Sequence, residues 1–221
     1  CVTAPSSHAV AIAQDRIDEK TFLESVAGVP VAPHAALLSA DDADSLDASL
    51  FPAILKTARM GYDGKGQRSV NSIAETKAAF AELGNRVCIL EKRLSLAKEV
   101  SVIVVRSLTG QTVTFPLFEN VHRNGILATT VFPARVSDEV SQKVRDYAAR
   151  IAETLQYKGV LCIEFFVLTD GTVSANEMAP RPHNSGHVTI EAAVTSQFEQ
   201  QVRAMTGLPL GDTSALCHGV M

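Results

Sequence analysis

The spacing of apolar residues along the chain predicts its helices and strands. Apolar side chains recur at helical spacing over residues 11–27, with charged residues between them, and Gly28 would end that helix. The same spacing predicts helices over 72–84, 138–155 and 189–205. Runs that alternate or are rich in β-branched residues predict strands at 51–57, 87–94, 99–107, 112–122, 125–134, 159–168 and 172–179. This order of elements indicates an α+β fold, because it lacks the repeated βαβ units of a doubly wound sheet.

Three short segments are expected to reverse the direction of the chain. Residues 96–98 would form a turn between strands 87–94 and 99–107. Asn124-Gly125 is typical of a two-residue hairpin loop. Residues 169–171, Thr-Asp-Gly, would close a third hairpin.

The third hairpin is predicted to place two carboxylates opposite each other. Counted outward from Asp170-Gly171, the register pairs Thr169 with Thr172, Leu168 with Val173, Phe166 with Ala175 and Glu164 with Glu177. Directly opposed like charges destabilise a sheet, so a cation is expected between the two glutamates. Oxygen ligands without histidine or cysteine suit magnesium. Asn176 could join the same ion only if the strand bends there, since strict alternation turns it to the other face.

Two other interpretations of this hairpin remain open on its residues alone. The glutamates could be exposed and repel each other weakly in water, although their apolar neighbours Phe166, Leu168 and Val173 argue against exposure. They could also be the acid and nucleophile of a glycoside hydrolase, which needs two nearby carboxyl groups.

A glycine-rich segment, MGYDGKGQ at residues 60–67, lies between the strand 51–57 and a further strand. Gly61, Gly64 and Gly66 would let backbone N–H groups approach an anion closely, and Lys56 on the preceding strand could reach a phosphate. Neither the dinucleotide fingerprint nor the P-loop motif is present. A plain hairpin turn is the alternative.

Composition narrows the range of partners. The chain has 221 residues, and its 20 Lys+Arg against 24 Asp+Glu give a net charge of −4, so it lacks the basic footprint that nucleic acid requires. The longest apolar run, residues 159–168, is too short to cross a membrane. The four cysteines form no C-x-x-C pair, which favours buried thiols in a reducing cytoplasm. The opening CVTAPSSHAV lacks an initiator methionine and a signal-peptide pattern, so we expect an internal start.

Taken together, the lysine-bearing strand, the glycine-rich loop, a later strand ending in Glu-Lys and the Glu…Asn-Glu hairpin resemble the ATP-grasp family. Within it, GYDGKGQ, ENVHRNGIL, NEMAPRPHNSGH and TSQFEQQVRAMTGLPLG are similar to strings of the 5-(carboxyamino)imidazole ribonucleotide synthetases of purine biosynthesis. The resemblance covers nearly the whole chain. It implies an α+β ATP-grasp fold in which two α+β subdomains hold MgATP between them.

The resemblance also divides the chain. Residues 1–20 would be a connector and the start of a helix, 21–95 a small subdomain with the glycine-rich loop, and 96–221 a large subdomain with the metal hairpin. Family members have an N-terminal domain and a C-terminal end that are missing here, so we expect the central portion of a longer enzyme.

Roles for single residues follow from the same resemblance. The nucleotide is expected to contact Lys56, Gly61, Tyr62, Asp63, Gly64, Lys65, Gly66, Gln67, Glu91, Lys92, Arg93, Leu94, Glu99, His122 and Asn176. Among these, Lys56 would bind phosphates, residues 91–94 adenine, and Glu99 the ribose hydroxyls. The expected magnesium ligands are Glu164, Glu177 and Asn176, and the expected catalytic residues are Arg181, His183, Tyr62 and Asp63.

Asn184 and Ser185 are expected to contact bicarbonate. They precede the helix predicted to begin near Thr189, and a helix N-terminus with free N–H groups is suited to binding an anion.

The function implied by the resemblance is ATP-dependent carboxylation of 5-aminoimidazole ribonucleotide with bicarbonate. The family suggests ATP and Mg²⁺ as cofactors, a cytoplasmic location and a homodimer, with no nucleic-acid or membrane partner. Another ATP-grasp ligase, or a nucleotide-binding fragment without catalysis, is the alternative.

Overall fold

The computed structural model describes residues 4–61, 66–123 and 125–221. Its smaller sheet is antiparallel and has the order β1-β4-β2-β3. The strands are β1 (His34–Leu37), β2 (Ala53–Thr57), β3 (Gln67–Val70) and β4 (Cys88–Lys92). Helix α3 (Ile73–Glu82) begins at Ser72, whose side chain accepts a hydrogen bond from the Glu75 N–H, and packs Phe80 into the core of this sheet. The predicted helix at 72–84 is therefore confirmed.

The larger sheet has the order β10-β9-β5-β7-β8-β11, with β6 paired to β5. Its strands are β5 (Leu96–Arg106), β6 (Thr112–Thr114), β7 (Phe118–Arg123), β8 (Ile126–Phe132), β9 (Gly159–Leu168), β10 (Val173–Ala179) and β11 (Gly219–Val220). Alternate residues of β5 serve two cores: Val102 packs with α4 (Asp138–Thr154), and Ile103 packs with α5 (Thr189–Ala192) and α6 (Gln197–Thr206). Both faces of this sheet are therefore covered.

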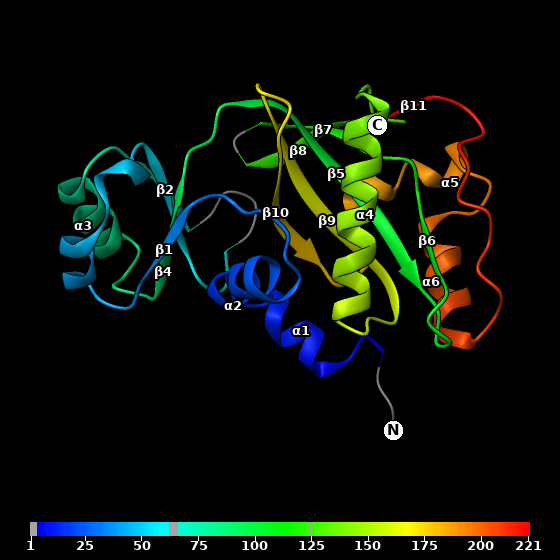
Figure 1. Cartoon of the computed structure of the whole chain (residues 1–221), viewed down its shortest axis with the longest axis horizontal. Helices are drawn as coiled ribbons and strands as arrows, with labels where there is room; N and C mark the ends of the chain where they lie inside the picture. Colours follow the sequence, from blue (N-terminus) through cyan, green and yellow to red (C-terminus); the bar gives the residue numbers. More distant parts are fainter. Residues whose placement is uncertain (1–3, 62–65, 124) are drawn as a thin grey trace.

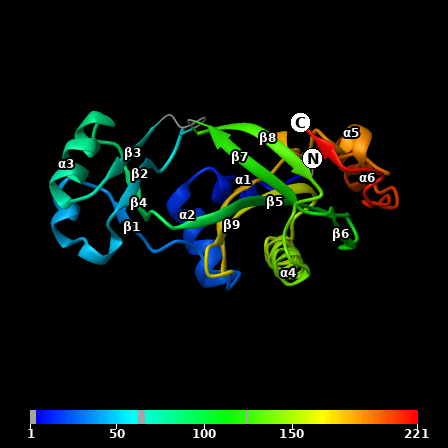
Figure 2. The ribbon, with the colours of Figure 1, turned by 90° about the horizontal axis from the view of Figure 1, so that it is seen from above.

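The arrangement of these parts is elongated. The smaller sheet and α3 lie at one end of the molecule, and α5 and α6 lie at the other (Figures 1 and 2). Three N-terminal helical segments, α1 (Ser7–Ala13), α2 (Arg16–Thr21) and the π-helix η1 (Phe22–Val26), follow one another, and α2 lies between the two sheets in both views. Short 3₁₀ helices are η2 (Asp41–Ser45), η3 (Ala48–Leu50) and η4 (Asn184–Gly186).

The single helix predicted over 11–27 is wrong in its boundaries. The helical region begins earlier, at Ser7, and is interrupted at Gln14 and Asp15. Asp15 has extended backbone angles, and its carboxylate accepts hydrogen bonds from the Ile17 and Asp18 N–H groups. The interruption has a local cause, because an aspartate that caps a helix start cannot also continue the preceding helix.

Three other boundaries differ from the prediction. No hairpin turn forms at 96–98, since these residues begin β5 and the chain passes from the smaller sheet to the larger one at 93–95. The strand predicted over 112–122 is two strands, separated by residues that include Pro116, which cannot donate to a ladder. The helix predicted over 189–205 is two helices, because Ser196 caps the start of α6.

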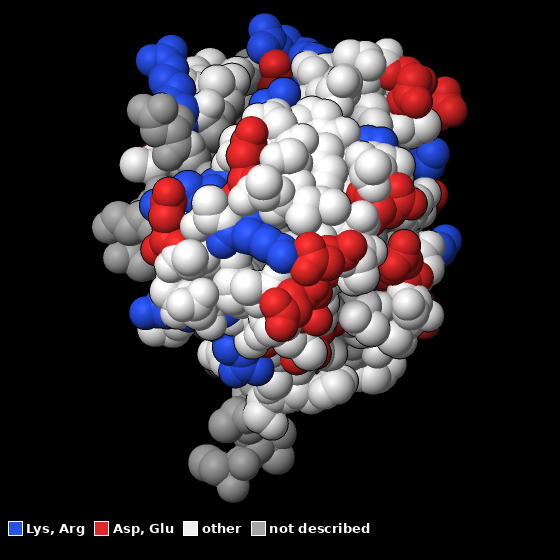
Figure 3. Space-filling view, turned by 90° about the vertical axis from the view of Figure 1, so that its left-hand side faces the viewer, with Lys and Arg blue, Asp and Glu red and all other residues white. Residues whose placement is uncertain are grey.

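The surface of the smaller sheet's end carries interspersed charges (Figure 3). The acidic run after β1 forms η2, where Asp44 pairs with Lys77 of α3 at 2.7 Å, and Arg68 of β3 pairs with Glu82 at 3.0 Å. Within the described part of the chain, no helix is long and apolar enough to cross a membrane.

Candidate active site

Lys56 lies in a buried cluster of charges at the junction of the two sheets. Its Nζ atom is 3.0 Å from Glu91 Oε2, and the Nζ atom of Lys20, on α2, is 3.4 Å from the same oxygen. Burial would raise the pKa of Glu91, but Lys56 and Lys20 outweigh it and lower this pKa to about 2. The carboxylate is therefore ionised and holds the two ammonium groups together.

The hairpin of β9 and β10, called the metal hairpin here for its predicted role, has the predicted glutamate pair but a different register. β9 and β10 pair Val167 with Val173 and Phe165 with Ala175, one residue away from the predicted pairs. A bulge between Ala175 and Glu177 then restores the pairing of Glu164 with Glu177. The expected pairing of Phe166 with Ala175 is therefore wrong. The length of the loop explains the shift in register. The Leu168 N–H donates to the Thr172 carbonyl, so the loop between the strands has three residues, 169–171, instead of the predicted two.

The bulge supplies the bend that Asn176 requires. The Asn176 side chain lowers the pKa of Glu164, which places the amide beside that carboxylate, while its Oδ1 atom is buried without a hydrogen-bond partner. Burial first, and Glu177 second, nonetheless raise the pKa of Glu164 to about 7. Two opposed carboxylates and an orphaned amide oxygen form a donor set that fits a magnesium ion, which takes one or two carboxylates and completes its octahedron with water and phosphates. In the described ranges, no group of three or more His, Cys, Asp and Glu residues forms a metal site, so this fit rests on two carboxylates and one amide.

Arg16 and Glu19 of α2 also reach this hairpin, and the sequence did not indicate them. Arg16 Nη1 donates to Glu177 Oε2 at 2.7 Å, and Arg16 outweighs burial to lower the pKa of Glu177. Glu19 accepts a 2.6 Å hydrogen bond from the Met178 N–H, and burial raises its pKa to about 8. Arg16, Glu19, Lys20 and Leu23 follow the i, i+3, i+4, i+7 spacing of one helix face. The three ionisable residues on the same face as Leu23 were the signal available in the sequence.

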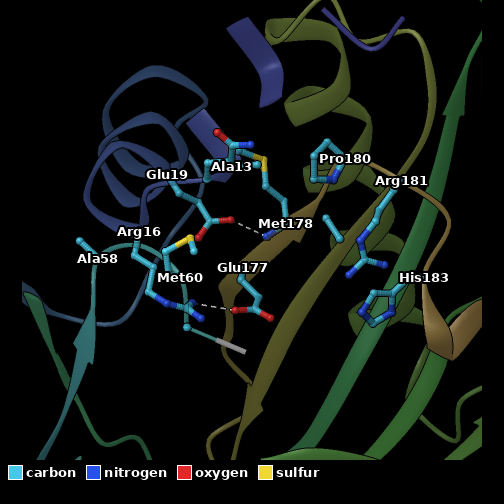
Figure 4. A pocket seen from close by; sticks show the side chains of 13 residues that line it. Ala13, Arg16, Glu19, Ala58, Met60, Glu177, Met178, Pro180, Arg181 and His183 are labelled. Atoms are coloured by element: carbon cyan, nitrogen blue, oxygen red, sulfur yellow. Dashed lines mark hydrogen bonds and ion pairs between the residues drawn. The ribbon is translucent and has the colours of Figure 1, made fainter. Parts of the chain in front are cut away.

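The catalytic candidates Arg181 and His183 face Arg16 and Glu177 across a cavity of about 240 Å³ (Figure 4). Gly61 also lines it. His183 Nε2 lies 3.3 Å from Glu164 Oε1. Burial and the nearby Arg181 lower the pKa of His183 to about 4, so its imidazole is neutral near pH 7. The cavity thus joins one candidate metal ligand, Glu177, to two side chains that can bind an anion.

Asn184 and Ser185, predicted to contact bicarbonate, lie before α5, which begins at Thr189 as predicted. The 3₁₀ helix η4 follows His183, and α5 has only four residues and no side-chain cap. Asn184 is exposed, whereas Ser185 is fully buried behind His183. The side chain of Ser185 is therefore turned to the interior rather than to the cavity.

The second group of nucleotide candidates lies on β5 and β7. His122 Nδ1 is 2.7 Å from Glu99 Oε2, and this contact raises the pKa of His122. Both line a cavity of about 220 Å³ with Lys98 and Glu119. Lys92 is half-buried at the end of β4, Arg93 is exposed and Leu94 is half-buried in the segment that links the two sheets.

Gly66 and Gln67 follow the glycine-rich loop, of which Tyr62, Asp63, Gly64 and Lys65 lie outside the described residues; so does Asn124 of the predicted hairpin loop. Gly66 has φ +77°, and a Cβ there would lie 2.7 Å from Thr57 Oγ1. A side chain is therefore excluded at the point where the loop rejoins β3. Gln67 pairs with Lys56 across β2 and β3.

Glu119 stabilises the wall of the second cavity. Hydrogen bonds from Arg135 and Lys98 lower the pKa of Glu119 to about 2, and they outweigh burial, which alone would raise it. Because this pKa lies below the ordinary 4.5, the stabilisation is present above about pH 4.5 and is lost as the pH falls towards 2. We expect Glu119→Gln to lower the free energy of unfolding at about pH 7 and to have a smaller effect at about pH 3.

Urea denaturation of both proteins across this range measures the difference. Glu153→Gln, at an exposed position of α4, is the control and should show no such trend. A Glu119→Gln effect that stays constant from pH 7 to pH 3 would contradict the role of the ionised carboxylate.

Comparison with known proteins identifies the class to which this fold and site belong. The family model of the ATP-grasp domain matches residues 22–198, and the chain belongs to the ATP-grasp family. The predicted α+β ATP-grasp fold is therefore confirmed.

Among its relatives, the chain is 47% identical over 223 residues to N5-carboxyaminoimidazole ribonucleotide synthase from Brucella melitensis, covering 98% of this chain and 60% of the relative. It is 45% identical over 216 residues to the enzyme of that name from Bacillus subtilis, covering 97% of this chain and 57% of the relative. The chain thus spans less than two thirds of the length of these relatives.

Solved structures agree with this assignment. An ADP complex of N5-carboxyaminoimidazole ribonucleotide synthetase superposes with a TM-score of 0.92 at 44% identity, covering 97% of this chain and 57% of that one. The synthase from Aspergillus clavatus with ADP and 5-aminoimidazole ribonucleotide gives a TM-score of 0.90 at 30% identity, covering 98% and 58%.

Proposed function

We propose that this chain is the ATP-binding portion of an enzyme that carboxylates 5-aminoimidazole ribonucleotide with bicarbonate and releases ADP and phosphate. The observation that carries the proposal is a series of contacts at the junction of the two sheets. Lys20, which shares Glu91 with Lys56, donates to the Asn176 carbonyl of the hairpin, and His183 lies 3.3 Å from Glu164. The similarity to synthases solved with ADP and with 5-aminoimidazole ribonucleotide supports it.

In this proposal the two sheets belong to the two subdomains, 21–95 and 96–221, with residues 1–20 as the connector. Lys56 binds the nucleotide phosphates, residues 91–94 adjoin adenine, and Glu99 with His122 contact the ribose side. Gly61, Gly66 and Gln67 contact the phosphates, and phosphate contacts of Gly64 and Lys65 and aminoimidazole contacts of Tyr62 and Asp63, which lie outside the described residues, stay predictions from the sequence. Glu164, Glu177 and Asn176 hold magnesium, which neutralises phosphate charge when bound.

The reaction we propose proceeds in three steps. A bicarbonate oxygen attacks the γ-phosphorus of ATP, and ADP leaves, forming carboxyphosphate. The carboxyphosphate C–O bond to the phosphoryl group then breaks and gives carbon dioxide and phosphate. The exocyclic amine of the ribonucleotide attacks the carbon dioxide and loses a proton to the released phosphate as the carbon–nitrogen bond forms. Arg181 and the neutral His183 donate hydrogen bonds to the carboxylate oxygens, and the half-buried cavity limits water, which would hydrolyse the intermediate.

A cytoplasmic location and a homodimer complete the proposal. The nearest alternative is another ATP-grasp ligase, which would share the nucleotide site and use a different acceptor. A nucleotide-binding fragment without turnover is a second alternative, because the chain spans 57–60% of its relatives.

The test is ADP release by a hybrid in which this chain replaces the matching segment of the Bacillus subtilis relative. With magnesium, ATP and bicarbonate present, we expect 5-aminoimidazole ribonucleotide to stimulate ADP release at least tenfold. The unaltered relative is the control for the assay. ATP binding without stimulation would remove the proposed acceptor and leave the ATP-grasp site.

A further inference from the structure

A line of buried hydrogen bonds runs from the larger sheet to His183 through side chains that the proposed reaction does not use. Thr130 Oγ1 donates to Asn120 Oδ1 at 3.1 Å, and Asn120 Nδ2 donates to Ser101 Oγ at 2.9 Å. Ser101 Oγ lies 2.8 Å from Ser185 Oγ, which lies 2.9 Å from His183 Nδ1. The line therefore joins β8, β7 and β5 to η4.

Two donors, the Ser185 N–H at one end and the Asn120 amide at the other, set the direction of the hydrogen bonds in this line. The Ser185 N–H donates to His183 Nδ1 at 3.3 Å, and because an N–H cannot accept, Nδ1 carries no proton. The Ser185 hydroxyl must then donate to Nδ1 as well, so it accepts from Ser101. Ser101 in turn accepts from Asn120, which leaves its own proton free for Ser185. The only proton of the neutral imidazole is consequently on Nε2, which faces Glu164 Oε1 at 3.3 Å.

The position of Ser101 connects this line to the metal hairpin. Ser101 pairs with Glu164 across β5 and β9, and on the other side with Phe118 of β7. Ser101 and Ser185 are both 0% exposed, where water cannot replace a lost partner. Not every buried serine has hydrogen-bond partners, since Ser174 Oγ on β10 has none.

We propose that Ser101, acting through the Ser185 hydroxyl and together with the Ser185 N–H, is a positioning residue that holds His183 in the tautomer with its proton on Nε2. The proposal rests on the proposed function for its consequence, namely that His183 presents an Nε2–H donor, rather than a lone pair, beside Glu164 to the reacting bicarbonate. The tautomer itself can be measured without turnover. The two proposals can therefore fail separately.

The tautomer is measured in the 221-residue chain with ¹⁵N-labelled histidine, from two-bond proton–nitrogen correlations at neutral pH. The signals of His183 are identified by their loss in His183→Gln. We expect the pattern of a neutral ring with a protonated Nε2. A protonated Nδ1 in the unaltered chain would overturn the proposal without any variant.

Ser101→Ala tests the positioning role. The Ser185 hydroxyl then loses the donor that directs its own proton to Nδ1, and only the 3.3 Å bond from the Ser185 N–H still opposes a proton on Nδ1, so we expect the ratio of Nδ1–H to Nε2–H to rise about tenfold, on the order of one hydrogen bond. Ser174→Ala is the matched control, because it removes a buried hydroxyl that has no partner, and it should leave the ratio unchanged. Thr130→Val removes only the first donor of the line and should give a smaller change in the same direction.

The outcomes separate the hypotheses. An unchanged ratio in folded Ser101→Ala would overturn the positioning role, and if that variant does not fold, an unchanged ratio in folded Thr130→Val would do so. Equal changes in Ser101→Ala and Ser174→Ala would indicate a nonspecific packing effect and would also overturn it. If the hybrid enzyme shows no stimulated ADP release while the tautomer behaves as stated, the proposed function fails and the positioning line stands.

Discussion

Glu177→Gln is expected to weaken magnesium-dependent nucleotide binding at least tenfold while leaving the fold intact. Glu177 is one of only two carboxylates in the proposed magnesium site, and an amide keeps its shape but supplies no charge to the ion. The substitution also removes the repulsion between Glu177 and Glu164, which offsets the loss of the 2.7 Å pair with Arg16. Calorimetric titration with ADP, in magnesium and in EDTA, measures the magnesium-dependent part of the affinity.

Two comparisons make this prediction specific. Glu153→Gln removes one exposed carboxylate and should bind MgADP as the unaltered chain does. In EDTA, Glu177→Gln and the unaltered chain should bind ADP within a factor of about two. A Glu177→Gln variant with undiminished MgADP affinity would remove Glu177 from the metal site.

Glu91→Gln is expected to be the most destabilising of the conservative substitutions in the site, by about 3 kcal/mol. The carboxylate is the shared partner of Lys20 and Lys56, and the Lys20 side chain is only 1% exposed. The loss of the carboxylate charge leaves the Lys20 ammonium buried without a counter-ion there, next to neutral acceptors such as the Asn176 carbonyl, 2.5 Å away. Urea denaturation measures the loss of unfolding free energy.

Lys20→Met is the matched variant, since Glu91 then keeps Lys56 and methionine fills a similar volume. We expect Lys20→Met to lower the unfolding free energy by less than Glu91→Gln does. The double variant should lose less than the sum of the two, because it has no Lys20 ammonium left buried without its counter-ion. Strict additivity would show that the two side chains do not interact.

The residues that carry the site were partly visible in the sequence. The local pattern predicted the strand of Lys56, the turn at Asp170-Gly171 and the pairing of Glu164 with Glu177. It did not predict the pairing of the residues between the turn and the glutamates. The three-residue loop shifts that pairing by one residue, and the bulge at Asn176 shifts it back before Glu177. Bulges depend on the packing of both strands and leave no local composition signal.

The charged stripe of α2 shows a different limit. An apolar periodicity implies a buried face, but the stripe here carries ionisable side chains: Glu19 and Lys20 are buried and Arg16 is half-buried between the two sheets. Their burial is stable because Glu177, Glu91 and the Met178 N–H, all distant in the chain, are in position to pair with them. No sequence window of helical length contains those partners.

The sequence by itself determined the α+β class, most helices and strands, the motifs of the ATP-grasp family and the facing glutamates, because these depend on local periodicity, turn chemistry and register. Only the tertiary structure decided which charges are buried, that Ser185 is turned inward, and that His183 meets Glu164. The physical reason is that burial and electrostatic pairing are set by residues up to about 160 positions apart, as for Arg16 and Glu177, which meet only when the two sheets and α2 pack together.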